Sequence, residues 1–282
     1  MDLSDNTKYL IVHADDAGLC HSENMATIQA LKNGIVNSYS IMTPCSGFDE
    51  IAKFAKDNPQ FDYGIHLTLT CEWENHRFGP VLPISEVPTL ADKNGHFFKT
   101  RNELKSNASI NHIEKELEAQ IKKSLEFGLT PSHLDSHMYS VGITGEVFSI
   151  YKELGIKYEL PVFMNNEVLA MVSEVNYIEQ NDFLIDHLLM GNFNDFKDGS
   201  LRDYYFKTLD NIKPGINILL LHTAFDDQEM KEITINHPNF GSEWRQIDFS
   251  FCTSEIAIAK IKENNLQLIN WNDIKKLQEN NT

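Results

Sequence analysis

The chain has few cysteines, few basic residues and no long apolar run. Its 282 residues include only four cysteines, widely spaced and without a CxxC pair. A disulfide framework is therefore not expected, and the thiols should be reduced. No apolar segment approaches the roughly 20 residues that cross a bilayer. The first residues, MDLSDNTK, also lack the basic and apolar pattern of a secretion signal. We therefore expect a cytoplasmic protein without a membrane partner.

The shortage of basic residues makes the chain strongly acidic. It has 24 lysines and arginines against 41 aspartates and glutamates, which gives a formal net charge of −17. Such a chain gains nothing from counterion release on a phosphate backbone, so nucleic acid is not an expected partner. Hydrophobic residues make up 41% of the chain and charged residues 23%, proportions that are ordinary for a globular protein with a substantial core.

Short apolar strands alternate with amphipathic helices along most of the chain. The patterns predict strands at 8–13, 37–43, 61–70, 131–139, near 156–163, at 216–225 and at 266–270. They predict helices at 23–33, 48–57, 111–128, about 145–154, 201–211, near 253–264 and at 271–279, with a polar loop over 226–241. Repeated βα units favour either a distorted (β/α) barrel or an open doubly wound sheet, both mostly parallel. The segment HADDAG lacks a GxGxxG loop, which argues against a dinucleotide-binding sheet.

Polar residues set the expected ends of two helices. Ser22 is a favourable N-cap for the helix at 23–33, and Asn111 for the helix at 111–128. In the second of these helices an apolar residue recurs every fourth position, which indicates one buried face. The residues of this stripe are Ile113, Leu117, Ile121 and Leu125.

No repeat, low-complexity tract or linker divides the chain, so we expect a single domain over residues 1–282. Within it, residues 71–110 are expected to form a long insertion or lid-like excursion, because prolines and glycines interrupt any periodicity there. Long irregular segments inside compact domains are often lids or binding loops. Residues 164–200 show no clear pattern, so neither of these two segments receives a defined role from the sequence.

Polar side chains gather at the expected carboxyl ends of several strands. His13, Asp15 and Asp16 follow the first strand, His66 lies within the third, and His222 follows the strongly apolar sequence INILLL. In parallel α/β folds these strand ends lie on one face of the sheet, where sites form. Two neighbouring carboxylates repel each other, and a bound cation is one way to offset that repulsion.

Neighbouring strand residues face opposite sides, so Asp15 and Asp16 can serve one site only if the chain turns there. Gly18 permits such a turn. A simpler alternative is that one carboxylate caps the following helix, but Ser22 is better placed for that role. His66 also has a simpler alternative, since a lone histidine in an apolar strand is often a hydrogen-bonded core residue.

The segment SHLDSHMY spaces His133, Asp135 and His137 two residues apart, so in a strand they share one face. A hydrogen-bonded His–Asp pair on a solvated face would have the same spacing. Asp135 is also well placed to orient a ligand histidine. Two imidazoles and one carboxylate with open positions suit a catalytic divalent cation. The joint placement of these groups at strand ends, rather than any single residue, indicates a site.

Five segments in this order resemble the YdjC/ChbG-like carbohydrate deacetylases over about residues 8–225. The segments are IVHADDAGLCHSEN, NGIVNSYSIMTP, YGIHLTL, PSHLDSHMY and LLLHTAF. The resemblance implies a distorted (β/α) barrel with mostly parallel strands, forming one catalytic domain. It further implies a metal-dependent hydrolase that removes acetyl groups from N-acetylated sugars such as chitooligosaccharides. A homodimer is plausible on the same grounds.

The resemblance also implies roles for individual residues. Asp16, His66 and His137 would be ligands of one divalent metal ion, either Mg²⁺ or Zn²⁺. Asp15 would be the general base, and His222 would be the acid that protonates the leaving amine. Further residues are expected beside the metal or on the substrate side: His133, Asp135, Tyr139 and Arg245. Arg245 and Asp248 would correspond to an arginine and a following acidic residue in the family pattern.

Four positions depart from the family pattern. Ala17 replaces a phenylalanine, Tyr139 a histidine, Thr223 a proline and His13 an asparagine. The metal and base positions are retained, so the changes fall on the sugar side and leave the substrate's identity, length and phosphorylation open. Another metal-dependent hydrolase, such as an esterase or phosphoesterase, and a sugar-binding protein without catalysis both remain alternatives.

Overall fold

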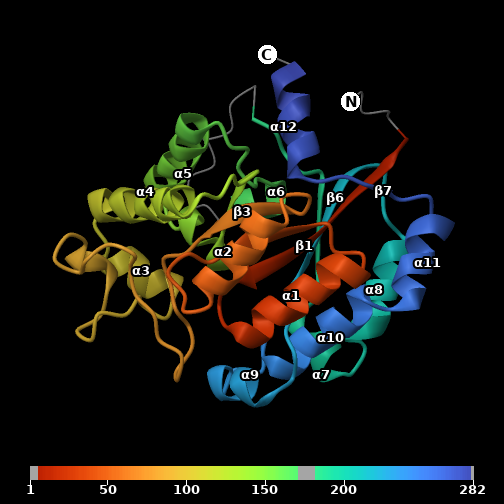
Figure 1. Ribbon diagram of the computed structural model, residues 1–282, viewed down its shortest axis with the longest axis horizontal. Helices are drawn as coiled ribbons and strands as arrows, with labels where there is room; N and C mark the ends of the chain where they lie inside the picture. Colours follow the sequence, from red (N-terminus) through yellow and green to blue (C-terminus); the bar gives the residue numbers. More distant parts are fainter. Residues whose placement is uncertain (1–5, 171–181, 281–282) are drawn as a thin grey trace.

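A computed structural model of the chain describes residues 6–170 and 182–280. Its centre is a sheet of parallel strands (Figure 1). The strands are β1 (Lys8–Ala17), β2 (Ser38–Ile41), β3 (Asp62–Leu67), β4 (Leu134–Ser136), β5 (His187–Met190), β6 (Gly215–Leu221) and β7 (Gln267–Leu268). They run in the order β4-β3-β2-β1-β6-β5, and β7 pairs with the beginning of β1. The central strand β1 therefore has neighbours on both sides, and its end is buried.

Two isolated bridges span the gap between the edge strands β4 and β5. Val162 pairs with Leu134 of β4, and Asn165 pairs with Ile185, just before β5. The sheet thus curls into half a barrel with surrounding helices, which confirms the predicted distorted (β/α) barrel and excludes the open doubly wound sheet. The predicted strand near 156–163 is wrong, because its first residues belong to a helix and only these bridges follow.

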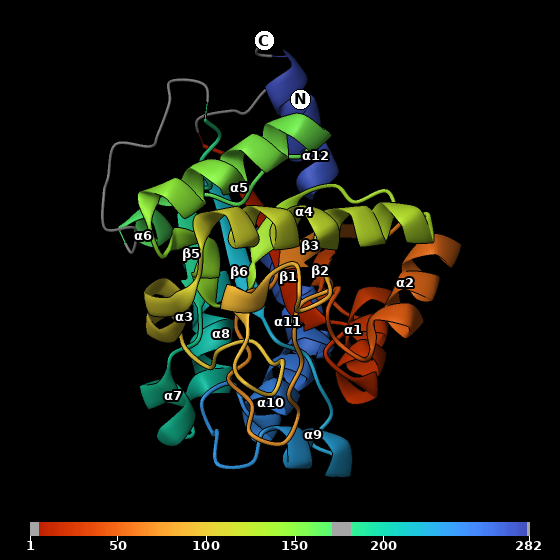
Figure 2. The same ribbon diagram turned by 90° about the vertical axis from the view of Figure 1, so that its left-hand side faces the viewer.

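Helices cover the sheet on both sides (Figures 1 and 2). Helices α4 and α5 pack against each other, and α8 packs against both α10 and α11. The helices are α1 (His21–Asn33), α2 (Phe48–Asp57), α3 (Arg101–Asn107), α4 (Ile110–Phe127), α5 (Gly145–Tyr158), α6 (Asn166–Leu169), α7 (Phe193–Lys197), α8 (Leu201–Asp210), α9 (Gln228–Ile233), α10 (Ser242–Cys252), α11 (Glu255–Glu263) and α12 (Trp271–Asn280). Two short 3₁₀ helices are η1 (Pro88–Leu90) and η2 (His137–Gly142). Helix α9 lies within the predicted polar loop at 226–241.

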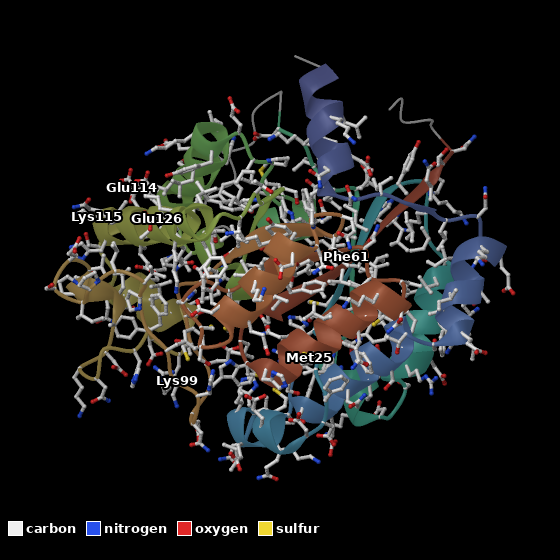
Figure 3. The ribbon with its side chains drawn as sticks, in the orientation of Figure 1. Met25, Phe61, Lys99, Glu114, Lys115 and Glu126 are labelled. Carbon is white, nitrogen blue, oxygen red and sulfur yellow. The ribbon has the colours of Figure 1, made fainter. Side chains whose placement is uncertain are left out.

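The predicted apolar stripe of α4 is largely correct. Ile113, Leu117 and Ile121 are buried in the core, whereas Leu125, in the last turn of the helix, is 40% exposed. Gly128 ends the helix in the left-handed conformation, with φ of 92°. Exposed charged residues occupy the opposite side of α4, and Figure 3 labels three of them: Glu114, Lys115 and Glu126.

Both predicted N-caps are wrong. Helix α1 begins after Cys20, without a side-chain cap, so neither an aspartate nor Ser22 caps it. The Ser22 hydroxyl instead donates a hydrogen bond to the carbonyl of Phe225, which ties α1 to the loop after β6. Helix α4 begins after Ser109, so Asn111 lies inside it. In α1 a contact between distant segments thus takes the place of the local hydrogen bond that the sequence pattern suggested.

The excursion after β3 is packed against the core. Its large apolar side chains are buried, and the N–H of Cys71 donates to the carbonyl of Phe98. The buried side chains include Trp73, Phe78, Val87, Leu90 and Phe97. A lid role for residues 71–110 and the single-domain organisation stay predictions.

Residues 171–181 of the unclear segment 164–200 lie outside the described part of the chain, and the remainder contains α6, β5 and α7. All four cysteines are free and buried, as expected. Within the described ranges, no helix is long and apolar enough to span a membrane.

Candidate metal centre and active site

Strand β1 turns sharply at its two aspartates. Asp16 has a φ of 66°, in the left-handed region, and the pairing register with β2 shifts between Ala14 and Ala17. This irregularity brings both carboxylates to one place. Nε2 of His222, directly after β6, lies 3.8 Å from Oδ2 of Asp15 and 4.0 Å from Oδ2 of Asp16. The predicted turn is therefore confirmed.

Three buried donor atoms meet at the carboxyl ends of the strands. Oδ1 of Asp16 lies 3.0 Å from Nδ1 of His137 and 3.3 Å from Nε2 of His66. All three donors lie within 4.8 Å of one another. A carboxylate and two imidazoles in this arrangement match the ligand set of a catalytic divalent cation. The structure thus brings together the three residues predicted as ligands.

His137 reaches this point by leaving the strand. Strand β4 covers only Leu134–Ser136, and η2 begins at His137, so the predicted strand at 131–139 is too long. Met138 and Tyr139 both have φ of 50°, a left-handed conformation that turns the chain. Ser136 between them is still extended and the turn follows His137, so Asp135 and His137 both point into the same cluster, one toward His66 and the other toward Asp16.

The carboxylate of Asp135 contacts the ring nitrogen of His66 that points away from Asp16. Nδ1 of His66 lies 2.8 Å from Oδ1 of Asp135 and 3.0 Å from the Ser40 hydroxyl, while Nε2 faces Asp16. The orientation of a ligand imidazole is commonly fixed by a hydrogen bond of this kind. Burial opposes ionisation of Asp135, but the charges of His66 and His13 outweigh it and lower the pKa of this carboxyl. Asp135 therefore has the orienting position that was predicted for it.

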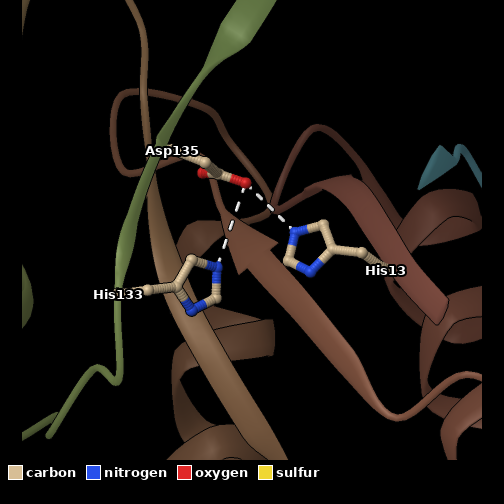
Figure 4. A group of neighbouring side chains, drawn as sticks. All are labelled: His13, His133 and Asp135. Carbon is tan, nitrogen blue, oxygen red and sulfur yellow. Dashed lines mark hydrogen bonds and ion pairs between the residues drawn. The ribbon is translucent and has the colours of Figure 1, made fainter. Parts of the chain in front are cut away.

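Asp135 also lies between two further histidines (Figure 4). Its Oδ2 is 3.0 Å from Nε2 of His13 and 4.0 Å from Nε2 of His133. His13 also approaches Oδ1 of Asp15 to 3.2 Å and so links two carboxylates. Burial lowers the pKa of His133 well below its usual value. Burial also acts to lower the pKa of His13, but hydrogen bonds to Asp135 and Asp15 raise it to about 9.

Two other sets of donors are as compact as the Asp16 set in the part of the chain that the structure describes. They combine Asp135 with His13 and His133, or with Asp15 and His66. Both oxygens of Asp135 already have close imidazole partners, however. The set of Asp16, His66 and His137 fits a metal better, because in each histidine the ring nitrogen that points away from Asp16 contacts another carboxylate. That carboxylate is Asp135 for His66 and Glu72 for His137.

The partner behind His137 is Glu72, which the sequence did not single out. Oε2 of Glu72 lies 3.0 Å from Nε2 of His137. Glu72 is in the excursion, within the sequence TLTCEWEN, where the apolar residues Leu69, Cys71 and Trp73 alternate with polar ones but no motif marks the glutamate. No signal in the chain marks this residue, because its contact joins segments that are 65 residues apart.

Arg245 of α10 pairs with two buried carboxylates. Its Nη2 lies 2.7 Å from Oδ2 of Asp16, and its Nη1 lies 2.9 Å from Oε2 of Glu23. Asp248, the acidic residue that follows Arg245 in the family pattern, accepts the backbone N–H of His222 and the hydroxyl of Tyr205. Arg245 thus holds the carboxylate of Asp16 in place, while Asp248 holds the backbone at His222.

An excess of carboxylates sets the electrostatics of the site. Burial opposes ionisation of Asp16, yet the charges of His137 and Arg245 hold the pKa of this carboxyl well below its usual range. Burial likewise acts to lower the pKa of His137, but Glu72 and Asp16 raise it to about 9. For His222, burial dominates and lowers the pKa to about 4. The surroundings of Asp16 thus favour the protonated form of His137, whereas those of His222, after β6, favour the neutral form.

Tyr139 lies at the border of this cluster. Its ring packs against Phe163 with a centroid distance of 6.4 Å, and its buried hydroxyl has no hydrogen-bond partner among the described residues. Such an unpaired donor is available to a bound molecule. The structure therefore leaves a substrate-side role for Tyr139 as a prediction.

Comparison with known proteins identifies the family. The family model of YdjC-like proteins matches residues 9–263, so the chain belongs to the YdjC-like family. The chain is 28% identical to a protein named carbohydrate deacetylase from Geobacillus stearothermophilus, over 96% of this chain and 99% of that one. A protein of the same name from Clostridium beijerinckii is 29% identical, over 94% and 99%.

Solved structures agree with this assignment. A crystal structure from Enterococcus faecalis, named for the cleavage of cellobiose phosphate, superposes with a TM-score of 0.78 at 26% identity and covers 95% of this chain and 99% of that one. The CE4 domain of a xylanase from the hindgut metagenome of Trinervitermes trinervoides reaches a TM-score of 0.51 at 10% identity, covering 97% and 92%. The second likeness concerns the fold alone.

Replacing Arg245 tests the electrostatic support of the site. The change Arg245→Gln removes the guanidinium that contacts both Asp16 and Glu23 in the buried interior, which we expect to lower the free energy of unfolding by about 3–5 kcal/mol. Denaturant titration measures this loss. The control is Arg202→Gln on the exposed side of α8, which should change stability by less than about 0.5 kcal/mol. Equal stability of the two variants would show that Arg245 is not needed to hold the carboxylates.

Proposed function

We propose that this protein is a metal-dependent hydrolase that removes an acetyl group from an N-acetylated sugar or oligosaccharide. The observation that carries the proposal is the meeting of Asp16, His66 and His137 within 4.8 Å, with Asp15 and His222 beside them. The relatives named carbohydrate deacetylases, which align over nearly their whole length, support the same activity.

Asp16, His66 and His137 would hold one divalent ion. When bound, such an ion would polarise the amide carbonyl and make a water molecule more acidic. Because Asp/His/His suits several divalent metals, both Mg²⁺ and Zn²⁺ are compatible with the site. Arg245 neutralises the second oxygen of Asp16, which leaves Oδ1 to face the two imidazoles.

Asp15 would accept the proton of the attacking water. Its Oδ1 lies 3.2 Å from His13, which fixes the carboxylate, and its Oδ2 is directed toward His222. Asp15 would pass that proton to Nε2 of His222, which lies 3.8 Å from its Oδ2, and His222 would give it to the departing nitrogen, because an amine leaves poorly without one. A C–O bond forms as the C–N bond breaks, and the products are acetate and the free amine of the sugar.

Several accompanying features are part of this proposal. The substrate would be a small carbohydrate, and residues 71–110 would be a lid or insertion beside its binding site. One catalytic domain, a homodimer and a cytoplasmic location remain our expectations from the sequence. His133 and Tyr139 would lie on the outer or substrate side of the metal ligands.

A product screen tests the activity directly. The full-length protein, stripped of metal and then supplied with Mg²⁺ or Zn²⁺, is incubated with N-acetylated mono- and oligosaccharides and with their phosphorylated forms. We expect release of acetate that requires the added metal. Release of phosphate without acetate would instead favour a phosphoesterase, and bound metal without any turnover would favour a sugar-binding protein.

Two substitutions separate metal binding from proton transfer. We expect His66→Ala to reduce the bound metal measured by elemental analysis, because a ligand is lost. We expect Asp15→Asn to retain the metal but to lower kcat by about 10²–10⁴-fold, because the base is lost. Full metal occupancy in the first variant, or a normal kcat in the second, would remove that residue from its proposed role.

A further inference from the structure

We infer that Glu72 is a positioning residue that orients His137 toward the metal and couples the excursion at residues 71–110 to the metal centre. This inference rests on the proposed metal site. It concerns a residue outside every motif of the chain.

The two ring nitrogens of His137 have different partners. Nδ1 lies 3.0 Å from Oδ1 of Asp16, and Nε2 lies 3.0 Å from Oε2 of Glu72. A ligand imidazole needs its lone pair on the nitrogen that faces the metal, so the proton must lie on the other nitrogen. An ionised carboxylate only accepts hydrogen bonds. Glu72 therefore favours the tautomer with Nε2–H and leaves Nδ1 free for the metal.

His66 has the same arrangement with its nitrogens exchanged. Its Nδ1 contacts Asp135, and its Nε2 faces Asp16. Each of the two ligand histidines thus has its own carboxylate behind the ring. One carboxylate comes from strand β4 in the centre of the fold, and the other comes from the segment that follows β3. The second pair therefore links the metal centre to a part of the chain outside the sheet.

The backbone on both sides of Glu72 is held in place. Cys71 and Trp73 are buried, and the guanidinium of Arg77 donates hydrogen bonds to both of their carbonyls. The N–H of Cys71 donates to Phe98 later in the excursion. The side chain of Glu72 is itself only 11% exposed. A carboxylate held this firmly can fix the ring that it contacts.

Glu72 stands behind His137 rather than among the ligands. Within the described residues, the compact donor set that contains His137 includes Asp16 and His66 but not Glu72. Its Oε2 instead contacts Nε2 of His137, the ring nitrogen that points away from Asp16.

The test is the divalent-metal affinity of Glu72→Gln in the full-length protein. Glutamine keeps the size of the side chain but removes the charge that selects the tautomer. Titration of the metal-stripped protein with Mg²⁺ and Zn²⁺, against a competing chelator, should show a Kd about 10–100-fold weaker than that of the wild type. The control is Glu74→Gln, the same change at a 53% exposed side chain, which should stay within about twofold.

Two measurements keep the outcomes distinct. Thermal unfolding of the metal-free variants establishes that they fold. Histidine ¹⁵N spectra of the metal-loaded wild type, which need no variant at Glu72, should show His137 protonated at Nε2 and coordinated through Nδ1. Unchanged metal affinity in a folded Glu72→Gln protein, or coordination through Nε2, would overturn this inference alone. Failure of the wild type to bind either metal would instead overturn the proposed metal site.

Discussion

Everything at the site depends on how one buried carboxylate is shared. Asp16 is held at a left-handed bend at the end of the central strand. One of its oxygens faces two imidazoles, and the other accepts a hydrogen bond from Arg245. The removal of any partner would leave a buried charge uncompensated, which is costly in a low-dielectric interior. The left-handed bend, the curled sheet and helix α10 are therefore all needed to place these partners around Asp16.

The same excess of negative charge that raises the pKa of His66 and His137 would attract a divalent cation. Without a metal, protons on these imidazoles neutralise the carboxylates around them. A bound cation would take the place of those protons, since metal ligands must be deprotonated. Burial, which prevents water from screening these charges, strengthens both effects.

The strand ends were predictable from the sequence because apolar runs followed by His or Asp mark where a parallel sheet opens to a site. The position of Asp16 follows from that rule, whereas His66 lies within the predicted strand at 61–70 and was assigned to the site through the family motif YGIHLTL. The course of the chain after His137 does not follow from the rule, since the spacing of SHLDSHMY indicates a continuous strand and only the structure shows the left-handed turn at Met138 and Tyr139. Glu72 and the partners of Arg245 were beyond prediction, because their contacts join segments that have no local pattern in common.

A crystal structure of the metal-loaded protein, with anomalous diffraction to locate the ion, tests the central claim most directly. The account predicts one ion bound by Oδ1 of Asp16, Nε2 of His66 and Nδ1 of His137. An ion bound instead among His13, His133 and Asp135 would contradict it. So would a structure at saturating metal in which no ion is bound and the three predicted ligands lie apart.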